Sequence, residues 1–279
     1  TEIYTLSLHD ALPIYGRSFT TIAITAQKSW SPTSVSGMSV NYVHGGYRLR
    51  SPFRHLDDEA YTDACVDDLN QVFDMMTSGD VAAMIAEPIQ GVGGFATPPD
   101  GFFGAMKKEL DNRGVLFISD EVQTGWGRTG ANFWGYQAHG MTPDILTFAK
   151  GVGNGLALGG VVAGAELMDS PPGNSIPTFG GNPMSSVGAL ATIRYMLEHD
   201  TQGHALAMGE RLAGHLRPAV EASAVVAELR GQGLMLAIET VQAGSLEPDS
   251  GAAGPIMEQA RAAGLLTCKG CLYGHVVRI

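Results

Sequence analysis

Apolar and polar positions alternate in blocks along most of the chain. Four short apolar runs have the length of buried strands: residues 81–86, 115–119, 145–149 and 159–163. Between the first two runs, a segment at 102–113 carries apolar residues at helical spacing, and Gly114 stands where a helix C-cap belongs. Fully apolar strands separated by helices predict an α/β fold with a mainly parallel sheet.

The pattern changes after residue 183. Two long amphipathic helices are predicted at 185–199 and 203–221. Two apolar runs come after them, at 225–230 and 234–240. A polar stretch at 244–255 follows, and then another helix and a last apolar run at 265–278. This arrangement predicts a smaller α+β domain at 188–279, joined to a large domain at 15–187 through a connecting helix.

The two ends differ from the rest of the chain. Residues 1–14 do not join smoothly to the segment after them, and they lack the basic start and small-residue cleavage site of a signal peptide. They resemble translated adapter sequence, and the alternative is a true helix or strand. The chain stops at residue 279 inside an apolar, strand-like run. We therefore expect a non-native leader at 1–14 on a truncated gene product.

Composition and charge exclude several classes of protein. The 279 residues are 44% hydrophobic and 16% charged, which is ordinary for a folded chain, and the net charge of −11 argues against a nucleic-acid partner. No apolar run is long enough to predict a membrane span. Three cysteines are too few for a disulfide framework, and the Cys268–Cys271 CxxC pair lacks the second pair or His cluster of a metal site. A reducing cytoplasm is the expected compartment.

Candidate chemistry lies at the ends of the predicted strands, where open α/β sheets bind ligands. Three motifs stand there: Asp120-Glu121-Val122-Gln123, Lys150 with the Gly-rich residues 151–155, and the turn 178–183. Asp120 could also be a solvated acid and Lys150 a surface lysine. The Gly-rich stretch does not fit a dinucleotide fingerprint, because Leu156 or Leu158 stands at the third glycine.

Asp120 and Lys150 together predict a specific chemistry. A parallel sheet brings the ends of separate strands together, where burial and neighbouring charges tune both groups. A lysine in a dry cleft can lose its proton and form a Schiff base. An aspartate facing a pyridine nitrogen keeps that nitrogen protonated and makes the ring an electron sink. These are the two requirements of pyridoxal phosphate chemistry.

Four segments resemble the signatures of class III pyridoxal-phosphate-dependent aminotransferases: AEPIQGVGG (86–94), ISDEVQTGWGRTG (118–130), PDILTFAKGVGNG (143–155) and TFGGNP (178–183). The segments FWGYQAHGMTPDI and RGQGLMLAIE are most similar to the alanine–glyoxylate branch. The resemblance covers residues 16–279. It implies the fold-type I architecture, with a large cofactor-binding domain of mainly parallel sheet between helices and a smaller C-terminal α+β domain.

The resemblance also implies cofactor contacts. Lys150 would carry pyridoxal 5'-phosphate as a Schiff base and act as general base and acid, and Asp120 would pair with the ring nitrogen. Val122 would pack on one ring face, and Gln123 would hydrogen-bond near the ring hydroxyl. Thr178 would reach the phosphate of the neighbouring subunit, which implies an obligate homodimer with shared active sites.

The same resemblance implies substrate contacts, and it shows where this chain departs from the family pattern. Arg278 would bind the substrate carboxylate, and Glu87 would help to position Gln123 or the substrate. The position of the family's stacking aromatic residue holds Ile14, and the Gly-Ser phosphate cup that precedes it is absent. Val92 stands where some members carry a glutamate, which argues against an ornithine- or 4-aminobutyrate-type site.

Three functional hypotheses remain open on sequence grounds. The first is transfer of an amino group from an amino acid to a 2-oxo acid such as pyruvate or glyoxylate. The second keeps the cofactor and changes the reaction, to an aminomutase or a decarboxylase. The third is an inactive fragment that binds nothing, which the missing phosphate cup and the missing aromatic residue favour.

Overall fold

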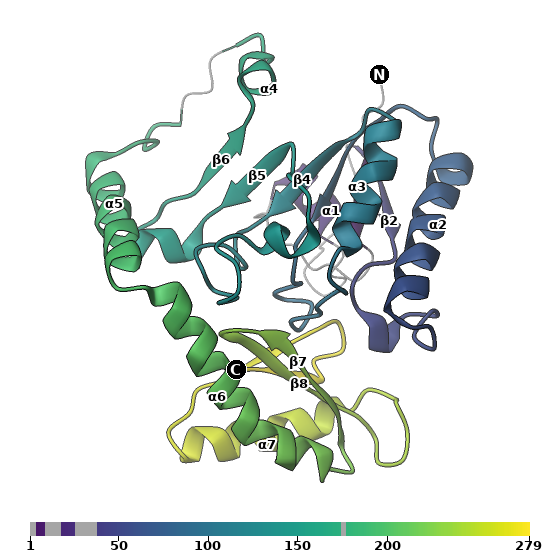
Figure 1. Ribbon diagram of the computed structural model, residues 1–279, viewed down its shortest axis with the longest axis vertical. Helices are drawn as coiled ribbons and strands as arrows, with labels where there is room; N and C mark the ends of the chain where they lie inside the picture. Colours follow the sequence, from purple (N-terminus) through teal and green to yellow (C-terminus); the bar gives the residue numbers. More distant parts are fainter. Residues whose placement is uncertain (1–3, 9–17, 26–37, 174–176) are drawn as a thin grey trace.

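The computed structural model describes residues 4–8, 18–25, 38–173 and 177–279. They form two sheets of different size, with helices on their outer sides (Figure 1). The larger sheet has six strands in the order β2-β1-β3-β4-β5-β6, and the smaller has four in the order β7-β8-β10-β9. A mainly parallel α/β sheet followed by a smaller α+β part confirms the predicted fold class.

The large sheet carries the candidate site on its parallel strands. Its members are β1 (Tyr4–Leu8), β2 (Ser39–Val43), β3 (Val81–Ala86), β4 (Leu116–Asp120), β5 (Ile145–Phe148) and β6 (Gly160–Ala163). Strands β1 to β5 run parallel, whereas β6 runs antiparallel to β5. The carboxyl ends of β3, β4 and β5 therefore meet at one edge of the sheet.

The first segment of the chain contributes a strand. β1 lies between β2 and β3 and pairs in parallel with both. A strand was one of the two interpretations of residues 1–14. The rest of that segment, including Ile14, lies outside the described residues, and its foreign origin stays a prediction.

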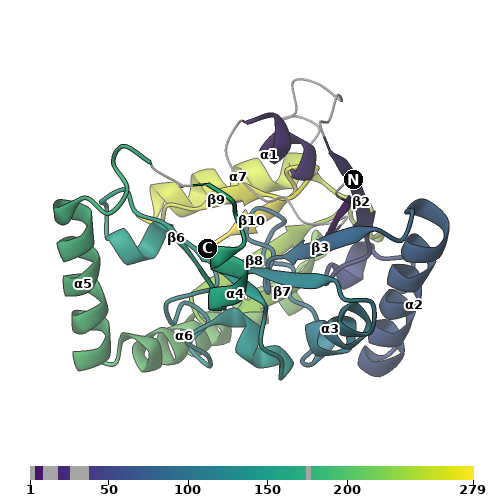
Figure 2. The same cartoon turned by 90° about the horizontal axis from the view of Figure 1, so that it is seen from above.

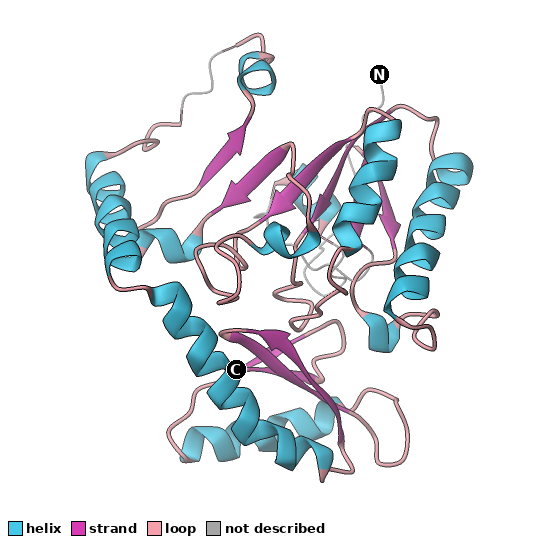
Figure 3. Ribbon diagram, in the orientation of Figure 1, coloured by secondary structure: helices cyan, strands magenta, loops and turns pink. Residues whose placement is uncertain are grey.

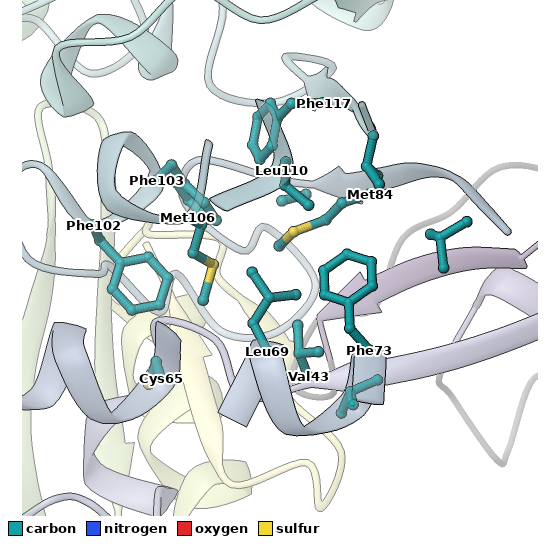
Figure 4. Packing of buried hydrophobic residues seen from close by; sticks show 14 of the residues in the cluster. Val43, Cys65, Leu69, Phe73, Met84, Phe102, Phe103, Met106, Leu110 and Phe117 are labelled. Atoms are coloured by element: carbon teal, nitrogen blue, oxygen red, sulfur yellow. The ribbon is translucent and has the colours of Figure 1, made fainter. Parts of the chain in front are cut away.

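Helices α2 (Asp58–Met76) and α3 (Phe102–Asn112) pack against the large sheet and against each other. Asp57 caps α2 by accepting a hydrogen bond from the Ala60 amide at 2.9 Å. Gly114 ends α3 in the left-handed conformation, φ 69°, as its C-cap position predicts. Figure 4 shows the core between these helices and the strands, which is built mainly from large side chains: Leu69, Phe73, Met84, Phe102, Phe103, Met106, Leu110 and Phe117.

β6 forms one edge of the large sheet, and few helices cover that edge. There β6 leads to the short helix α4 (Ala165–Asp169) and then to α5 (Pro183–Glu198), which lies at the far edge of the molecule (Figure 2). Asn182 caps α5 by accepting from the Ser185 amide at 3.0 Å. The boundary predicted between residues 187 and 188 falls within this helix, which α6 (Thr201–Glu221) follows on the way to the small sheet.

The small sheet is antiparallel and is covered by α6 and α7 (Ser250–Ala262) (Figure 3). Its strands are β7 (Val226–Gln232), β8 (Met235–Thr240), β9 (Cys268–Gly270) and β10 (Val276–Arg278). Helix α7 begins inside the stretch predicted to be polar, because Asp249 caps it through the Gly251 and Ala252 amides. The predicted run 265–278 divides into β9 and β10 around a turn.

Candidate active site

Three ionisable residues stand at the ends of adjacent parallel strands. Glu87 directly follows β3, Asp120 ends β4, and Lys150 follows β5 after one residue. The strands pair in that order, with Ala86 opposite Ser119 and Asp120 opposite Thr147. All three residues therefore lie at the same edge of the sheet, as the prediction for Asp120 and Lys150 required.

Lys150 begins a 3-10 helix, Lys150–Gly153, with a φ of 51° that is uncommon for a residue other than glycine. Its side chain as a whole is exposed, but the protein around its amino group is dense enough for desolvation to lower its pKa. The charges of Glu87 and Asp120 oppose this shift, and that of Arg278 adds to it. The amino group therefore lies within electrostatic reach of all three residues.

Glu87 is buried, with 4% of its surface exposed. Burial and the charge of Asp120 raise its pKa to about 8, against the Gly91 hydrogen bond and the positive charges of Lys150 and Arg278. One carboxyl oxygen accepts from the Gly91 amide at 2.9 Å, and the other has no partner among the described residues. Such an unpaired buried oxygen is available to a bound ligand.

A cavity of about 500 Å³ opens beside Lys150. Val122 and Gln123 line it together with Lys150, as do Phe95 and Arg128. Its volume lies in the range of small-molecule and cofactor sites. Three of the residues predicted to hold a cofactor thus share one cavity, and the buried carboxyls of Glu87 and Asp120 lie at the same strand ends.

The carboxylate-binding candidate comes from the small sheet. Arg278 lies at the end of β10 and donates from Nη1 to the Gly91 carbonyl at 3.2 Å and from Nη2 to the Lys269 carbonyl at 3.2 Å. Its guanidinium carbon is 5.7 Å from the centre of the Phe95 ring, and its Nε has no partner in the described part of the chain. The structure thus brings Arg278 to the same loop that holds Glu87.

We call residues 90–96 the junction loop. All seven are buried, and Gln90 pairs with Ala96 across the loop. A side-chain Cβ at Gly91 would lie 2.0 Å from Gln123 Nε2, so the loop backbone packs directly on the Gln123 side chain. Glu87, Gln123 and Arg278 all contact this loop through Gly91.

Thr178 is not brought to the Lys150 cavity. It is exposed in the turn before α5, and it is absent from the described residues that line the cavity. Its predicted contact is with a second subunit, so this placement leaves that prediction untested. Ile14 and Tyr15, which stand at the join with the leader, lie outside the described residues.

Glu121 is a residue of the site region to which sequence reasoning assigned no role. It is fully buried and accepts hydrogen bonds from the Gly135 and Tyr136 amides at 2.8 Å each. The hydroxyls of Ser119 and Thr124 donate to it at 3.2 and 2.5 Å. Glu121 therefore fixes the turn after β4, and its place between Asp120 and Val122 was the only local signal.

Cys268 and Cys271 remain free thiols, one exposed and one buried. Within the described ranges, no group of three or more His, Cys, Asp or Glu residues is arranged to hold a metal ion. In the same part of the chain, none of the helices has the length and apolar character needed to cross a bilayer.

Comparison with known proteins identifies the family of this chain. Residues 13–279 match the Aminotransferase class-III family. The chain belongs to the class III aminotransferases. This match confirms the resemblance on which the cofactor assignment rests, since the class is pyridoxal-phosphate dependent.

Relatives of this class III aminotransferase chain differ in their reactions. It is 36% identical over 270 residues to the mitochondrial alanine–glyoxylate aminotransferase 2 homolog 2 of Arabidopsis thaliana, covering 95% of this chain and 54% of that protein. It is 38% identical over 200 residues to an alanine/serine racemase of Pyrococcus horikoshii, covering 72% of this chain and 42% of that protein. The chain thus spans about half the length of these two curated relatives.

A solved structure supports the fold. An amine transaminase from an uncultivated Pseudomonas species, in its PLP-bound form, superimposes on the chain with a TM-score of 0.90 at 28% identity. The superposition covers 100% of this class III aminotransferase chain and 64% of the other.

Proposed function

We propose that the protein is a pyridoxal-phosphate-dependent transaminase, which moves an amino group from an amino acid to a 2-oxo acid such as pyruvate or glyoxylate. The observation that carries the proposal is the meeting of Lys150 and Asp120 at the ends of neighbouring strands, beside a cavity of about 500 Å³. Family membership supports the same chemistry.

The described residues fit the cofactor. An aldehyde needs a primary amine that can lose its proton, and desolvation lowers the pKa of Lys150. A protonated ring nitrogen needs a carboxylate, and Asp120 is buried at 4% exposure at the end of the neighbouring strand. When bound, pyridoxal phosphate supplies an electron sink for the bonds at the substrate's α-carbon.

Four residues of the chain have separate roles in this proposal. In this proposal Lys150 Nζ would hold the cofactor and would move the substrate's α-proton, because a lysine freed of its proton is a general base. Asp120 would hold the ring nitrogen in its charged form, Val122 would pack on the ring face, and Gln123 would orient the ring through its hydroxyl. Lys150, Val122 and Gln123 line the cavity, which supports their roles, and Asp120 ends the strand next to Lys150.

The substrate end of the site would be Arg278 and Glu87. A guanidinium is suited to bind a carboxylate with two parallel hydrogen bonds, and Arg278 Nε has no partner among the described residues. Val92 leaves no acidic side chain at that position to pair with Arg278, so the proposal has no acid there that would compete with an α-carboxylate for the guanidinium.

We also infer a homodimer in which Thr178 serves the partner's phosphate site. The support is a group of exposed apolar side chains on β6, α4 and α5: Val161, Val162, Met168, Met184, Val187, Leu190, Tyr195 and Leu197. Such a large apolar surface indicates a protein interface. We also infer a reducing compartment such as the cytoplasm, because three cysteines are too few for a disulfide framework.

A transfer assay tests the proposed reaction. The chain loaded with pyridoxal phosphate should convert L-alanine and glyoxylate into pyruvate and glycine, and Lys150→Ala should abolish pyruvate formation. Arg261→Ala, a change at an exposed residue of α7, is the matched control and should keep the activity. Absence of pyruvate and of any other keto-acid product with every amino donor tried would reject the transaminase function.

A second candidate reaction is suggested by the similarity to an alanine/serine racemase. A racemase also moves the α-proton but leaves the amino group on the substrate. Incubating the loaded chain with L-alanine and no acceptor separates the two, because D-alanine without pyruvate indicates racemisation. An aminomutase or a decarboxylase would be recognised in the same assay by its own products. An inactive fragment would show no absorbance band of bound cofactor.

A further inference from the structure

A buried polar cluster lies where the two sheets meet. We call Tyr47, Arg230, Glu239 and His275 the Arg230 cluster; Tyr47, Glu239 and His275 are buried, and the Arg230 side chain is 9% exposed. They come from distant segments: Tyr47 precedes the 3-10 helix Arg48–Arg50, Arg230 is in β7, Glu239 is in β8, and His275 precedes β10. The cluster therefore joins the N-terminal part of the large domain to three segments of the small one.

Glu239 is the centre of the cluster, with no exposed surface. Tyr47 donates to it at 2.7 Å, His275 Nε2 is 3.0 Å away, and Arg50 Nε donates at 2.6 Å. Arg230 also pairs with it through Nη1. Burial alone would raise the pKa of Glu239, but the hydrogen bonds from His275 and Arg230 and the Arg230 charge hold it well below its usual value.

Arg230 uses its guanidinium in three directions. Nη1 pairs with Glu228 and Glu239, Nη2 donates to the Tyr47 hydroxyl at 3.3 Å, and Nε donates to the Gly94 carbonyl at 2.8 Å. The guanidinium carbon lies 4.6 Å from the centre of the Tyr47 ring. The first two directions anchor the side chain, and the third directs it at the junction loop.

The junction loop needs such an anchor. Gly94 and Phe95 have φ values of 91° and 54°, so the backbone there takes an uncommon conformation. The small domain contacts the loop at Gly94 through Arg230, at the Val92 carbonyl through the Cys271 amide at 2.7 Å, and at Gly91 through Arg278. Of these three, Arg230 alone bonds to the strained end.

We propose that Arg230 is a positioning residue, whose bond to Gly94 fixes the junction loop and thereby the relative positions of Glu87 and Arg278. The chain of contacts runs from Arg230 to Gly94, from Gly94 to the Gly91 carbonyl at 3.3 Å, and from Gly91 to both site residues. The role for substrate binding rests on the proposed function. The role for the loop does not depend on it.

Arg230 thereby gains a role beyond the stabilisation of the small sheet. Its place before an apolar run predicts only a structural residue, and its ion pair with Glu239 agrees with that. A residue that only stabilised the small sheet would not need a donor aimed at the other domain. Lysine at this position could keep a charge beside Glu239 but has no planar fork to reach Gly94 and Tyr47 at once.

Hydrogen exchange of the full chain without cofactor tests the role for the loop. In Arg230→Lys, the amides of residues 90–96 should exchange about tenfold faster than in the wild type, because a charge-assisted bond to a buried carbonyl is lost. The amides of β7 and β8 should stay close to wild type, and Tyr47→Phe should loosen the same loop by a smaller factor. Arg261→Lys, in an exposed pair with Glu258, is the matched control.

Two results would overturn the proposal. One is an unchanged exchange rate at 90–96 in both Arg230→Lys and Tyr47→Phe. The other is equal acceleration across both sheets, which would mean that the cluster only stabilises the fold.

Kinetics of the cofactor-loaded chain tests the role for the substrate. Arg230→Lys should raise the KM for glyoxylate by about tenfold and change kcat by a smaller factor, because Arg278 is displaced from the carboxylate. A fall in kcat with an unchanged KM would overturn this part. If the wild-type chain transfers no amino group, the proposed function fails, and the exchange measurement still decides the role of Arg230 in the loop.

Discussion

Glu87 and Asp120 are two buried carboxyls at neighbouring strand ends, and burial together with the nearby charge of Asp120 decides how Glu87 titrates. Desolvation and the charge of Asp120 raise the pKa of Glu87 from 4.5 to about 8. Near neutral pH Glu87 therefore retains its proton. The proposal gives the two acids different roles, with Asp120 at the ring nitrogen and Glu87 at the substrate end of the site.

Glu87 should make the stability of the chain pH-dependent. Between about pH 4.5 and 8 the folded chain holds this proton and the unfolded chain releases it, so stability falls as pH rises through this window. Glu87→Gln should remove a loss on the order of a few kcal/mol between pH 5 and 8. Denaturant unfolding at both pH values measures it, with exposed Glu221→Gln as control. An equal pH dependence in wild type and Glu87→Gln would contradict the assignment.

Gly91 should be required for cofactor affinity more than for folding. A Cβ there would meet the amide end of Gln123 at 2.0 Å, and that flexible end can move aside. Gly91→Ala should therefore displace Gln123 and weaken pyridoxal phosphate binding by about tenfold, with a much smaller change in the free energy of unfolding. Absorbance titration measures the affinity and denaturant unfolding the stability. Gly214→Ala, where an added Cβ meets nothing within 4 Å, is the control. Wild-type affinity in Gly91→Ala would show that Gln123 does not orient the cofactor.

At the scale of elements, the strand ends were predictable because the apolar runs before Glu87, Asp120 and Lys150 are each followed at once by a charged residue. The helix α2 was not predicted, since its buried positions Tyr61, Cys65 and Leu69 stand among acidic residues. The antiparallel direction of β6 was missed as well, because strand direction depends on the path of the connection rather than on the run itself. The Arg230 cluster could not be predicted, because its members are distant in the sequence and meet only after both sheets form.

The turn after β4 should depend on Glu121. Its carboxylate accepts from the Gly135 and Tyr136 amides, and an apolar replacement would leave those buried donors unpaired. Glu121→Ala should lower the free energy of unfolding by about 3 kcal/mol or more, and Glu121→Gln by less. Denaturant unfolding measures both, with Glu221→Ala as control. A change of less than about 1 kcal/mol in Glu121→Ala would mean that water replaces the carboxylate there.

At the scale of the whole molecule, α5 exposes more large apolar side chains than any other helix in the described ranges. It buries only Ser185 and Ala189, while Met184 and Val187 are 73% and 65% exposed. A helix that is apolar on its exposed side needs a covering surface. The sequence alone could predict a dimer only through the family resemblance, because exposure is a property of the folded chain.

The dimer should separate when a charge enters this surface. Val187→Glu should raise the dimer dissociation constant at least about tenfold, because the carboxylate must be desolvated in the interface. Sedimentation velocity over a range of concentrations measures it. Ala207→Glu, on the exposed face of α6, should leave association unchanged. A wild-type chain that stays monomeric at every concentration would contradict the inferred dimer.

The identity of the lysine that holds the cofactor can be measured directly. The chain is incubated with pyridoxal phosphate, the bond is reduced with borohydride, and the modified peptide is located by mass spectrometry. We expect a single modified site at Lys150, lost in Lys150→Ala, while Lys107, Lys108 and Lys269 stay unmodified. Specific modification at another lysine, or an unchanged pattern in Lys150→Ala, would contradict the assignment of Lys150.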